Sequence, residues 1–254
     1  METRRTMRII SGKHKARKIT PPPDKTTTRP IPDRVKEALF NLLRGHFEGA
    51  TVLDCFAGTG SIGLEALSRG ASRCVFVERD KRMAAVLQRN IDFLGEQDRA
   101  EIVTADAVGP LALARCPTPL KLAFLDPPYP MTRDKDDWER VIRQCAAFIG
   151  NMQPDGFLMV RTPWPAIRKT RLAPASADPP APSLHGDTRP ARKRRGAGQV
   201  SADDAEPALD AADAPGGGQP PPPEDIELAI PGADGPETHS YRHTAIHLYA
   251  PATT

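Results

Sequence analysis

The chain has 254 residues, which is enough for one α/β domain with additions or for two small domains. A hydrophobic fraction of only 39% together with 28 prolines predicts an ordered core accompanied by a disordered segment. No apolar run reaches the length of a membrane-spanning helix, and no apolar segment of an export signal follows the basic N-terminus. We therefore expect a soluble, cytoplasmic protein.

Positive charge is concentrated at the N-terminus. The formal net charge is +3, but residues 1–36 contain eleven lysines and arginines and only three acids. This segment therefore carries a charge of +8 and leaves about −5 for the rest of the chain. A basic arm of this kind is typical of proteins that contact the phosphate groups of nucleic acids.

The four cysteines are predicted to be free thiols that form neither disulfides nor a metal site. They are scattered without the close Cys/Cys or Cys/His spacing of a zinc site, at Cys55, Cys74, Cys116 and Cys145. Isolated cysteines behave as small apolar residues that pack in a core. We expect no disulfide, no metal and a reducing compartment.

The first predicted elements are a basic hairpin and a helix. Two short β-prone segments, 8–11 and 17–20, flank a Gly-Lys-His-Lys turn. A linker rich in proline and threonine follows over residues 21–28. A helix then begins at Pro32, and Asp33 is expected to cap its first amide groups.

From residue 50 the chain alternates between strand and helix patterns. Strands are expected at 51–54, 74–77, 101–104, 120–125, 157–161, 226–230 and 244–249. Helices are expected at 61–68, 81–94 and 137–148, with a short one ending near residue 114. Repeated units of this length predict an α/β fold with a doubly wound, mostly parallel sheet, whose edge is closed by the last strand.

A long low-complexity segment interrupts this pattern. Residues 173–224 consist mainly of Pro, Ala, Gly, Asp and Ser, and they contain a basic run at 189–195 that we interpret as solvated charge. Such a composition cannot bury enough apolar surface to fold, so we expect a disordered insertion. The rest is predicted to form a basic N-terminal arm, hairpin and helix over 1–48, and one domain from 49–172 and 225–250.

A glycine-rich loop follows the first strand of the alternating region. Residues 58–63 read Gly-Thr-Gly-Ser-Ile-Gly, and Glu78 lies about 18 residues beyond Gly60. Taken alone, this pattern is the fingerprint of a dinucleotide site. Asp54, however, stands where a pyrophosphate would lie, and two like charges would repel each other there. A ligand with an ammonium, a sulfonium and no phosphate, S-adenosylmethionine, suits this acid better.

Acids end four successive predicted strands, at Asp54, Glu78, Asp106 and Asp126. Because parallel strands end at the same edge of a sheet, these carboxylates are expected to line one site. There Glu78 would bind the ribose hydroxyls of the cofactor, and Asp106 would accept a hydrogen bond from its adenine amino group.

The last of these acids begins a stiff segment, Asp126-Pro127-Pro128-Tyr129. Proline cannot donate to a sheet and restricts the residue before it, so the strand ends at Asp126 and the next residues are extended. A carboxylate and an aromatic ring are thereby held at a fixed separation at the ligand-binding edge.

Several segments resemble known methyltransferases. Residues 54–60 are similar to motif I of the Rossmann-like S-adenosylmethionine-dependent methyltransferases. Residues 126–129 resemble the (Asp/Asn/Ser)-Pro-Pro-(Tyr/Phe) motif of those that methylate exocyclic amino groups of bases. Residues 7–12 and 29–41 resemble the bacterial 16S ribosomal RNA guanine-N2 methyltransferase family, the small-subunit methyltransferase D family, which modifies guanine 966.

The similarity covers roughly residues 7–168 and 239–249. The insertion has no counterpart in it, and residues 241–244 read Tyr-Arg-His-Thr where the family tends to have Tyr-Gly-x-Thr. The resemblance implies a seven-stranded, Rossmann-like sheet. It also implies methyl transfer from S-adenosylmethionine to the exocyclic N2 amino group of a guanine in 16S rRNA, during small-subunit maturation.

The expected site follows from these residues and from the resemblance. Cofactor contacts are expected from Asp54, Phe56, Ala57, Gly58, Gly60, Glu78, Asp106 and Asp126. Asp126, Pro127 and Tyr129 are the expected catalytic residues, and Pro128 and Tyr129 would contact the target base. Phosphate contacts are expected from Arg8, Lys13, Lys15, Arg17, Arg29 and Arg34. Trp138 and Trp164 are expected to be packing residues.

Three other functions fit parts of the pattern. A DNA adenine-N6 or cytosine-N4 methyltransferase shares both motifs but usually needs a larger target-recognition region. A non-catalytic RNA-binding assembly factor could keep the sheet, although the intact acids speak against it, and an NAD-dependent oxidoreductase could use the glycine loop. The expected partner is 16S rRNA within a small-subunit assembly particle, bound by a monomer without a metal or a membrane.

Overall fold

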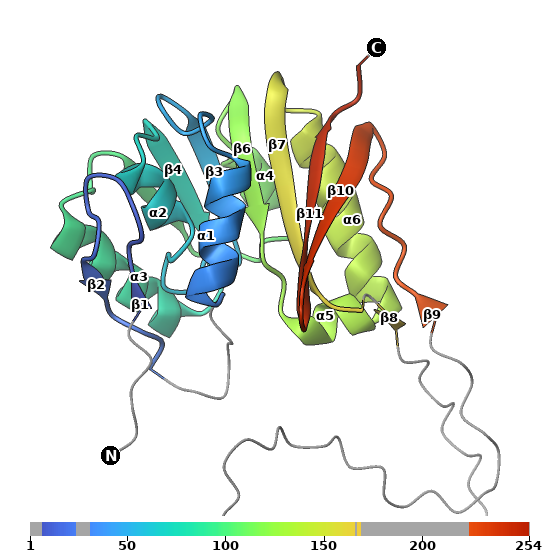
Figure 1. The fold of residues 1–254 in the computed structure, drawn as a ribbon, viewed down its shortest axis with the longest axis horizontal. Helices are drawn as coiled ribbons and strands as arrows, with labels where there is room; N and C mark the ends of the chain where they lie inside the picture. The colour runs from blue at the N-terminus through green and yellow to red at the C-terminus, as the bar shows by residue number, and fades with distance from the viewer. Residues whose placement is uncertain (1–6, 24–30, 166, 169–223, 254) are drawn as a thin grey trace, which may run out of the picture. The chain divides into compact units, whose positions relative to one another are not determined.

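A central seven-stranded sheet lies between helices in the computed structural model, which describes residues 7–23, 31–165, 167–168 and 224–253 (Figure 1). The strands of this sheet are β3 (Thr51–Cys55), β4 (Arg73–Val77), β5 (Ala100–Val103), β6 (Leu120–Leu125), β7 (Met152–Pro163), β10 (Ala233–Tyr241) and β11 (Thr244–Pro251). The helices are α1 (Asp33–Leu42), α2 (Gly63–Ser68), α3 (Lys81–Leu94), α4 (Pro110–Ala114), α5 (Tyr129–Arg133) and α6 (Lys135–Ile149). Two short pairs lie outside it: β1 (Met7–Arg8) with β2 (Lys18–Ile19), and β8 (Ile167–Arg168) with β9 (Glu224–Asp225).

The order of the strands across the sheet is β10-β11-β7-β6-β3-β4-β5. The five strands from β7 to β5 are parallel, and β11 and β10 are added antiparallel at one edge. The order reverses between β3 and β6, because the chain first moves outward through β4 to β5 and then returns to the other side of β3. Doubly wound sheets bind ligands at the carboxyl ends of the strands beside such a switch point. The predicted Rossmann-like, mostly parallel fold is confirmed.

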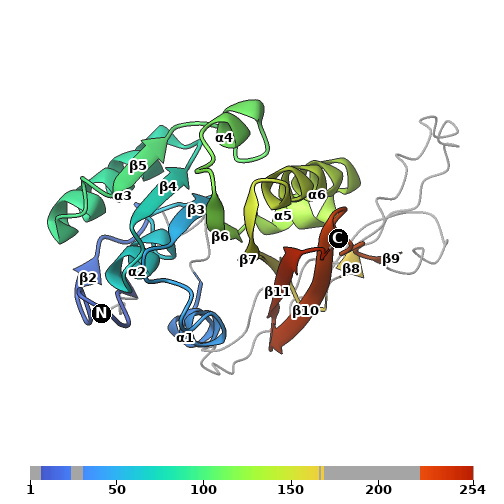
Figure 2. The same ribbon diagram turned by 90° about the horizontal axis from the view of Figure 1, so that it is seen from above.

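Each face of the sheet is covered by its own hydrophobic core. On one face, Leu39 of α1, Leu64 of α2 and Leu87 of α3 belong to one buried cluster. On the other face, Trp138 and Phe148 of α6 belong to a second. Figure 2 shows α1 and α2 on the opposite side of the sheet from α4 and α6. Strands covered on both faces need apolar side chains at successive positions, which is why their sequences do not alternate with polar residues.

Two predictions near the C-terminus are wrong. Residues 226–230 do not form a strand, and their isoleucines at 226 and 230 are buried in the second core without strand pairing. The strand that closes the edge is β10, not β11, which lies between β10 and β7. The sequence of β10, Ala-Asp-Gly-Pro-Glu-Thr-His-Ser-Tyr, hides the strand because it is an exposed edge strand with a bulge, where glycine and proline are tolerated.

The N-terminal hairpin and helix are present as predicted, with differences at their ends. β1 and β2 pair antiparallel but contain only two residues each. The N-cap of α1 is Pro32, whose side chain has no hydrogen-bond acceptor to cap with; Asp33 is the first helical residue, and its carboxylate pairs with Arg8 at 3.2 Å. The sequence did not predict α5, which begins at Tyr129 immediately after the two prolines. Proline favours the first turn of a helix as well as an extended segment, so the stiff motif is also a helix start.

The predicted disorder over 173–224 lies outside the described residues except for Glu224, which belongs to β9, and stays a prediction. The basic run at 189–195 also lies outside them. Among the helices that the structure describes, none is long and apolar enough to cross a membrane.

Candidate active site

The glycine loop between β3 and α2 has a backbone that side chains would obstruct. Gly60 has φ +83°, and a Cβ atom there would lie 2.4 Å from Cδ1 of Leu87. A Cβ at Gly63 would lie 2.3 Å from Cε1 of Phe76, so the third glycine lets α2 pack directly on β4. Even Phe56 adopts a left-handed conformation, with φ 59°. The loop thus presents its backbone at the carboxyl end of β3, as a cofactor cradle requires.

The rest of this loop is fixed to β4 and its following residues. Ala57 is buried and donates its amide hydrogen to the carbonyl of Val77 at 3.1 Å. Gly58 donates its amide hydrogen to Oε2 of Glu78 at 2.8 Å, and Oε1 of Glu78 accepts one from Asp80 at 2.8 Å. Glu78 therefore joins the loop after β3 to the loop after β4 and keeps unused lone pairs for a ligand.

Asp54 is almost completely buried, with 1% of its surface exposed. Its Oδ2 accepts a hydrogen bond from the amide of Gly63 at 2.8 Å, so the carboxylate holds the first turn of α2 against β3. Burial raises the pKa of Asp54 well above its usual range, the Gly63 amide opposes this, and the carboxylates of Asp126 and Glu78 raise it further. Glu78 binds the Gly58 amide of the glycine loop, and the amide of Asp126 is bonded to Cys55, the residue after Asp54, so three of the four predicted acids lie at the carboxyl end of β3.

Replacing Asp54 by Asn is expected to give a variant whose stability, relative to the wild type, improves as the pH rises. A carboxyl group whose pKa is raised on folding holds its proton more tightly in the folded state, so its contribution is lost as the pH rises through that pKa. Urea unfolding of both proteins at pH 4.5, 6 and 7.5 measures this difference. The same substitution at exposed Asp98 is the control, and a difference that does not change with pH would contradict the prediction.

Asp106 follows β5 and faces α6. Its Oδ2 accepts a hydrogen bond from Arg140 at 2.8 Å, and its Oδ1 accepts one from the amide of Val108 at 3.2 Å. Hydrogen bonds to Asp106 and Asp137 raise the pKa of Arg140. The carboxylate lies at the same edge of the sheet as the other three acids, with its orientation set by Arg140.

The Asp126–Tyr129 segment follows β6, next to the glycine loop. The amide of Asp126 donates to the carbonyl of Cys55 at 3.4 Å, which ties the end of β6 to the end of β3. Pro127 is buried, Pro128 is extended, and Tyr129 is partly exposed. Arg161 of β7 binds both oxygens of the Asp126 carboxylate, a contact that the motif analysis did not predict.

The donor set at this edge fits S-adenosylmethionine. Acids and backbone groups surround the loop, and the expected acids converge there. A ligand with an ammonium and a sulfonium matches this charge better than a pyrophosphate does. Within the described part of the chain, His, Cys, Asp and Glu side chains form no group of three or more that could hold a metal ion.

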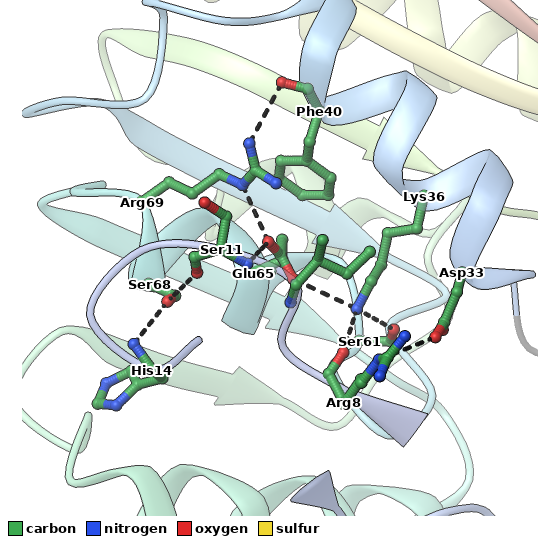
Figure 3. A network of polar contacts seen from close by, with 12 residues as sticks. Arg8, Ser11, His14, Asp33, Lys36, Phe40, Ser61, Glu65, Ser68 and Arg69 are labelled. Carbon is green, nitrogen blue, oxygen red and sulfur yellow. Dashed lines mark hydrogen bonds and ion pairs between the residues drawn. The ribbon is translucent and has the colours of Figure 1, made fainter. Parts of the chain in front are cut away.

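The N-terminal arm is attached to the domain by a buried polar network around Glu65 of α2 (Figure 3). Glu65 accepts hydrogen bonds from the amides of Ile10 and Ser11 at 2.7 and 2.9 Å. It also forms ion pairs with Lys36 at 3.4 Å and Arg69 at 2.9 Å. Both Glu65 and Lys36 are at most 1% exposed, so one basic residue of the arm serves the interior and not a nucleic acid.

The same arm contacts the glycine loop. Nζ of Lys36 lies 3.4 Å from Oγ of Ser61, which belongs to that loop. Asn90 of α3 donates to the carbonyls of Thr20 and Thr59, at 3.2 and 3.0 Å, and accepts from the Thr20 amide at 2.8 Å. The position of the arm and the conformation of the loop are therefore linked.

Five of the six basic residues predicted to contact phosphate are exposed. These are Arg8, Lys13, Lys15, Arg17 and Arg34, whereas Arg29 lies outside the described residues. Lys13 pairs with Glu96 at 3.4 Å, and Arg17 lies over the exposed ring of Phe93, 4.9 Å from its centroid. The structure gathers them on the arm and the start of α1.

The two tryptophans differ in their surroundings. Trp138 is buried as predicted, and its Nε1 donates to the carbonyl of Glu227 at 2.6 Å. Trp164, also predicted to be a packing residue, lies just beyond the end of β7 with 38% of its surface exposed, so the structure covers it only in part.

Comparison with solved structures supports the architecture. The Escherichia coli protein yhhF has a TM-score of 0.60 and 24% identity, over 97% of this chain and 98% of that chain. HI0767 of Haemophilus influenzae has a TM-score of 0.58 and 22% identity, over 98% and 99%. At such identities the likeness shows the fold alone.

Sequence comparison gives the family. Ribosomal RNA small subunit methyltransferase D of Escherichia coli (strain K12) is 42% identical over 123 residues, 48% of this chain and 60% of that protein. Its namesake in Haemophilus influenzae is 39% identical over 124 residues, 48% of this chain and 64% of that protein. The matches thus span less than two thirds of these relatives. A family model described as conserved hypothetical protein 95 matches residues 7–169, which is more than half of the chain. The chain therefore belongs to this family, that of the ribosomal RNA small subunit methyltransferase D proteins.

Proposed function

We propose that the protein methylates the exocyclic N2 amino group of a guanine in 16S rRNA, expected to be guanine 966. The observation that carries this proposal is the placement of the Asp126–Tyr129 segment beside the glycine loop, with the amide of Asp126 bonded to Cys55. It puts an acceptor carboxylate and an aromatic ring next to a cradle suited to a sulfonium cofactor. The names of the rRNA methyltransferase relatives support the substrate class.

The cofactor would be held by the residues at the end of the parallel strands. When bound, S-adenosylmethionine supplies a methyl group on a positively charged sulfur, which passes to the amino nitrogen while one amino proton is lost to water. Glu78 would bind the ribose hydroxyls and Asp106 the adenine amino group. The backbone of Phe56, Ala57, Gly58 and Gly60, with Asp54 beneath it, would surround the remainder.

The target nitrogen is a poor nucleophile because its lone pair is delocalised into the ring. Asp126 would accept a hydrogen bond from one N–H of the amino group, and the carbonyl of Pro127 would accept a hydrogen bond from the other. These two contacts favour a pyramidal nitrogen. Both acceptors interact more strongly as positive charge develops on the nitrogen, so they stabilise the transition state more than the ground state. Pro128 and Tyr129 would hold the ring of the base, which must leave its stack to enter the site.

The exposed arginines and lysines of the N-terminal arm would contact RNA phosphates and orient the substrate without reading its sequence. We infer that the protein acts as a monomer on 16S rRNA within a small-subunit assembly particle. The described domain, 49–165 with 225–253, has no additional subdomain that would serve a DNA methyltransferase as a target-recognition region.

The test is methyl incorporation from labelled S-adenosylmethionine into deproteinised 16S rRNA, small-subunit particles and double-stranded DNA. We expect label in ribosomal RNA, recovered as N2-methylguanine at one position after nuclease digestion. Label confined to DNA would favour an amino methyltransferase of another class. Absence of label in every substrate, with S-adenosylmethionine still bound, would favour a non-catalytic assembly factor.

A further inference from the structure

Arg161 lies beside the acceptor carboxylate because of the register of the sheet. Leu125 of β6 pairs with Val160 of β7 in parallel, so the next residues, Asp126 and Arg161, are neighbours at the carboxyl edge. Arg161 follows four apolar residues of β7, Phe-Leu-Met-Val, and an arginine is unusual in a part of a strand that is buried on both faces. Its position therefore calls for a role at this edge.

The contact between the two side chains is bidentate. Nε of Arg161 lies 2.6 Å from Oδ1 of Asp126, and Nη2 of Arg161 lies 2.8 Å from Oδ2. This arrangement fixes the plane of the carboxylate as well as its position, which a single hydrogen bond does not. The guanidinium carbon also lies 5.7 Å from the centroid of the Tyr129 ring. One side chain thus contacts the proposed acceptor and the proposed stacking ring.

The pair is shielded from water. Arg161 is 5% exposed, and the side chain of Asp126 is 17% exposed. Burial opposes the charged form of Arg161, but the charge and hydrogen bonds of Asp126 outweigh it and raise the pKa of Arg161. A guanidinium with so little exposed surface is poorly placed to reach an RNA phosphate. Its two hydrogen bonds to Asp126 hold it at the acceptor instead.

We propose that Arg161 is a positioning residue that sets the orientation of Asp126 and Tyr129 for the target amino group. This inference rests on the proposed function and extends it to a residue outside the Asp-Pro-Pro-Tyr motif. A carboxylate offers about four lone-pair sites, and the bidentate pair uses one on each oxygen. One of the remaining lone pairs can accept one amino hydrogen of the base, while the carbonyl of Pro127 accepts the other. By holding the carboxylate in one plane, Arg161 fixes the direction of that lone pair.

Three variants test this role. Arg161→Gln removes the charge and the fork, Arg161→Lys keeps the charge without the planar fork, and Arg143→Gln is a matched control on the exposed surface of α6, with 68% of that side chain exposed. We expect kcat for RNA methylation to fall about 100-fold in the Gln variant, the loss associated with a misplaced catalytic group. The kcat of the Lys variant should be roughly tenfold higher than that of the Gln variant, because lysine still supplies a cation. The control should match the wild type.

Three further measurements distinguish a positioning role from a purely structural one. KM for RNA, the dissociation constant of S-adenosylmethionine and the melting temperature should stay close to the wild-type values in the Lys variant. Losses in kcat that are matched by a lower melting temperature and weaker cofactor binding, or a Lys variant no better than the Gln variant, would overturn the inference.

Nuclear magnetic resonance of the arginine side chains tests the ion pair without any activity. In the wild type, the Nε–H group of Arg161 should give a signal protected from exchange with water, and Asp126→Asn should remove this protection. A protected signal in a protein that methylates no RNA would overturn the proposed function while leaving the ion pair in place. An unprotected signal in an active protein would overturn the positioning role alone.

Discussion

Replacing Asp126 by Asn is expected to lower the rate of RNA methylation at least about 1000-fold, since the acceptor aimed at the developing charge is lost. The amide of asparagine would present a donor where both the target amino group and Arg161 donate. Two donors would then face each other in a site with little access to water. Single-turnover transfer from labelled S-adenosylmethionine to 16S rRNA measures the loss.

The cofactor should still bind to this variant. Asp126 borders the cradle, but Glu78 and the loop backbone keep their contacts, so the dissociation constant of S-adenosylmethionine should change only a few-fold. Asp98→Asn, at an exposed position, is the control for the loss of one negative charge. An Asp126 variant that retains a tenth or more of the wild-type rate would exclude this carboxylate as the acceptor.

Glu65→Ala is expected to lower the free energy of unfolding by about 3–5 kcal/mol, the range found when one member of a buried ion pair is removed. The substitution would leave Lys36, at 1% exposure, without its principal countercharge. It would also leave the amides of Ile10 and Ser11 without their acceptor. Burial already lowers the pKa of Lys36, so the uncompensated amine would favour its neutral form. Urea unfolding at neutral pH measures the change.

Two controls separate the network from the mere loss of a carboxylate. Glu37→Ala changes an exposed acid on α1, one residue from Lys36, and should cost less than about 1 kcal/mol. The double change Glu65→Leu with Lys36→Met replaces the Glu65–Lys36 pair by apolar groups and should recover the part of the loss that comes from the buried amine, while the amides of Ile10 and Ser11 stay without their acceptor. If the Glu65 variant were as stable as the Glu37 variant, the network would not be what attaches the arm.

The sequence predicted the elements whose boundaries are set by local chemistry. The helix expected at 81–94 is α3 with the same bounds, because Asp80 caps its first turn and Gly95 ends it in a left-handed conformation. The strand expected at 120–125 is β6, because proline stops it on one side. The edge strand β10 was missed, since its partner β11 supplies the pairing that its own polar sequence does not indicate.

The candidate site was predicted only where a motif marks it. The acids converge because parallel strands end at one edge, and this follows from topology. The pairing of Arg161 with Asp126 depends on β6 and β7 being neighbours and on the register between them. No local sequence pattern predicts either of these. In the sequence, Lys36 is one of many basic residues of the arm. Only the structure shows that it is buried and paired with Glu65, where α1 lies beside α2.

The pairing of β8 with β9 has a consequence for how the chain can vary in length. Ile167 is opposite Asp225, and Arg168 is opposite Glu224, so the two ends of the intervening sequence are held side by side. Each doubling in the length of a connection between fixed ends costs only about 0.6 kcal/mol of closure entropy. The domain can therefore host an addition at this point, or lose one, with little effect on the sheet. Evolution can lengthen or shorten the protein here while β7, β11 and the carboxyl edge of the sheet stay in register.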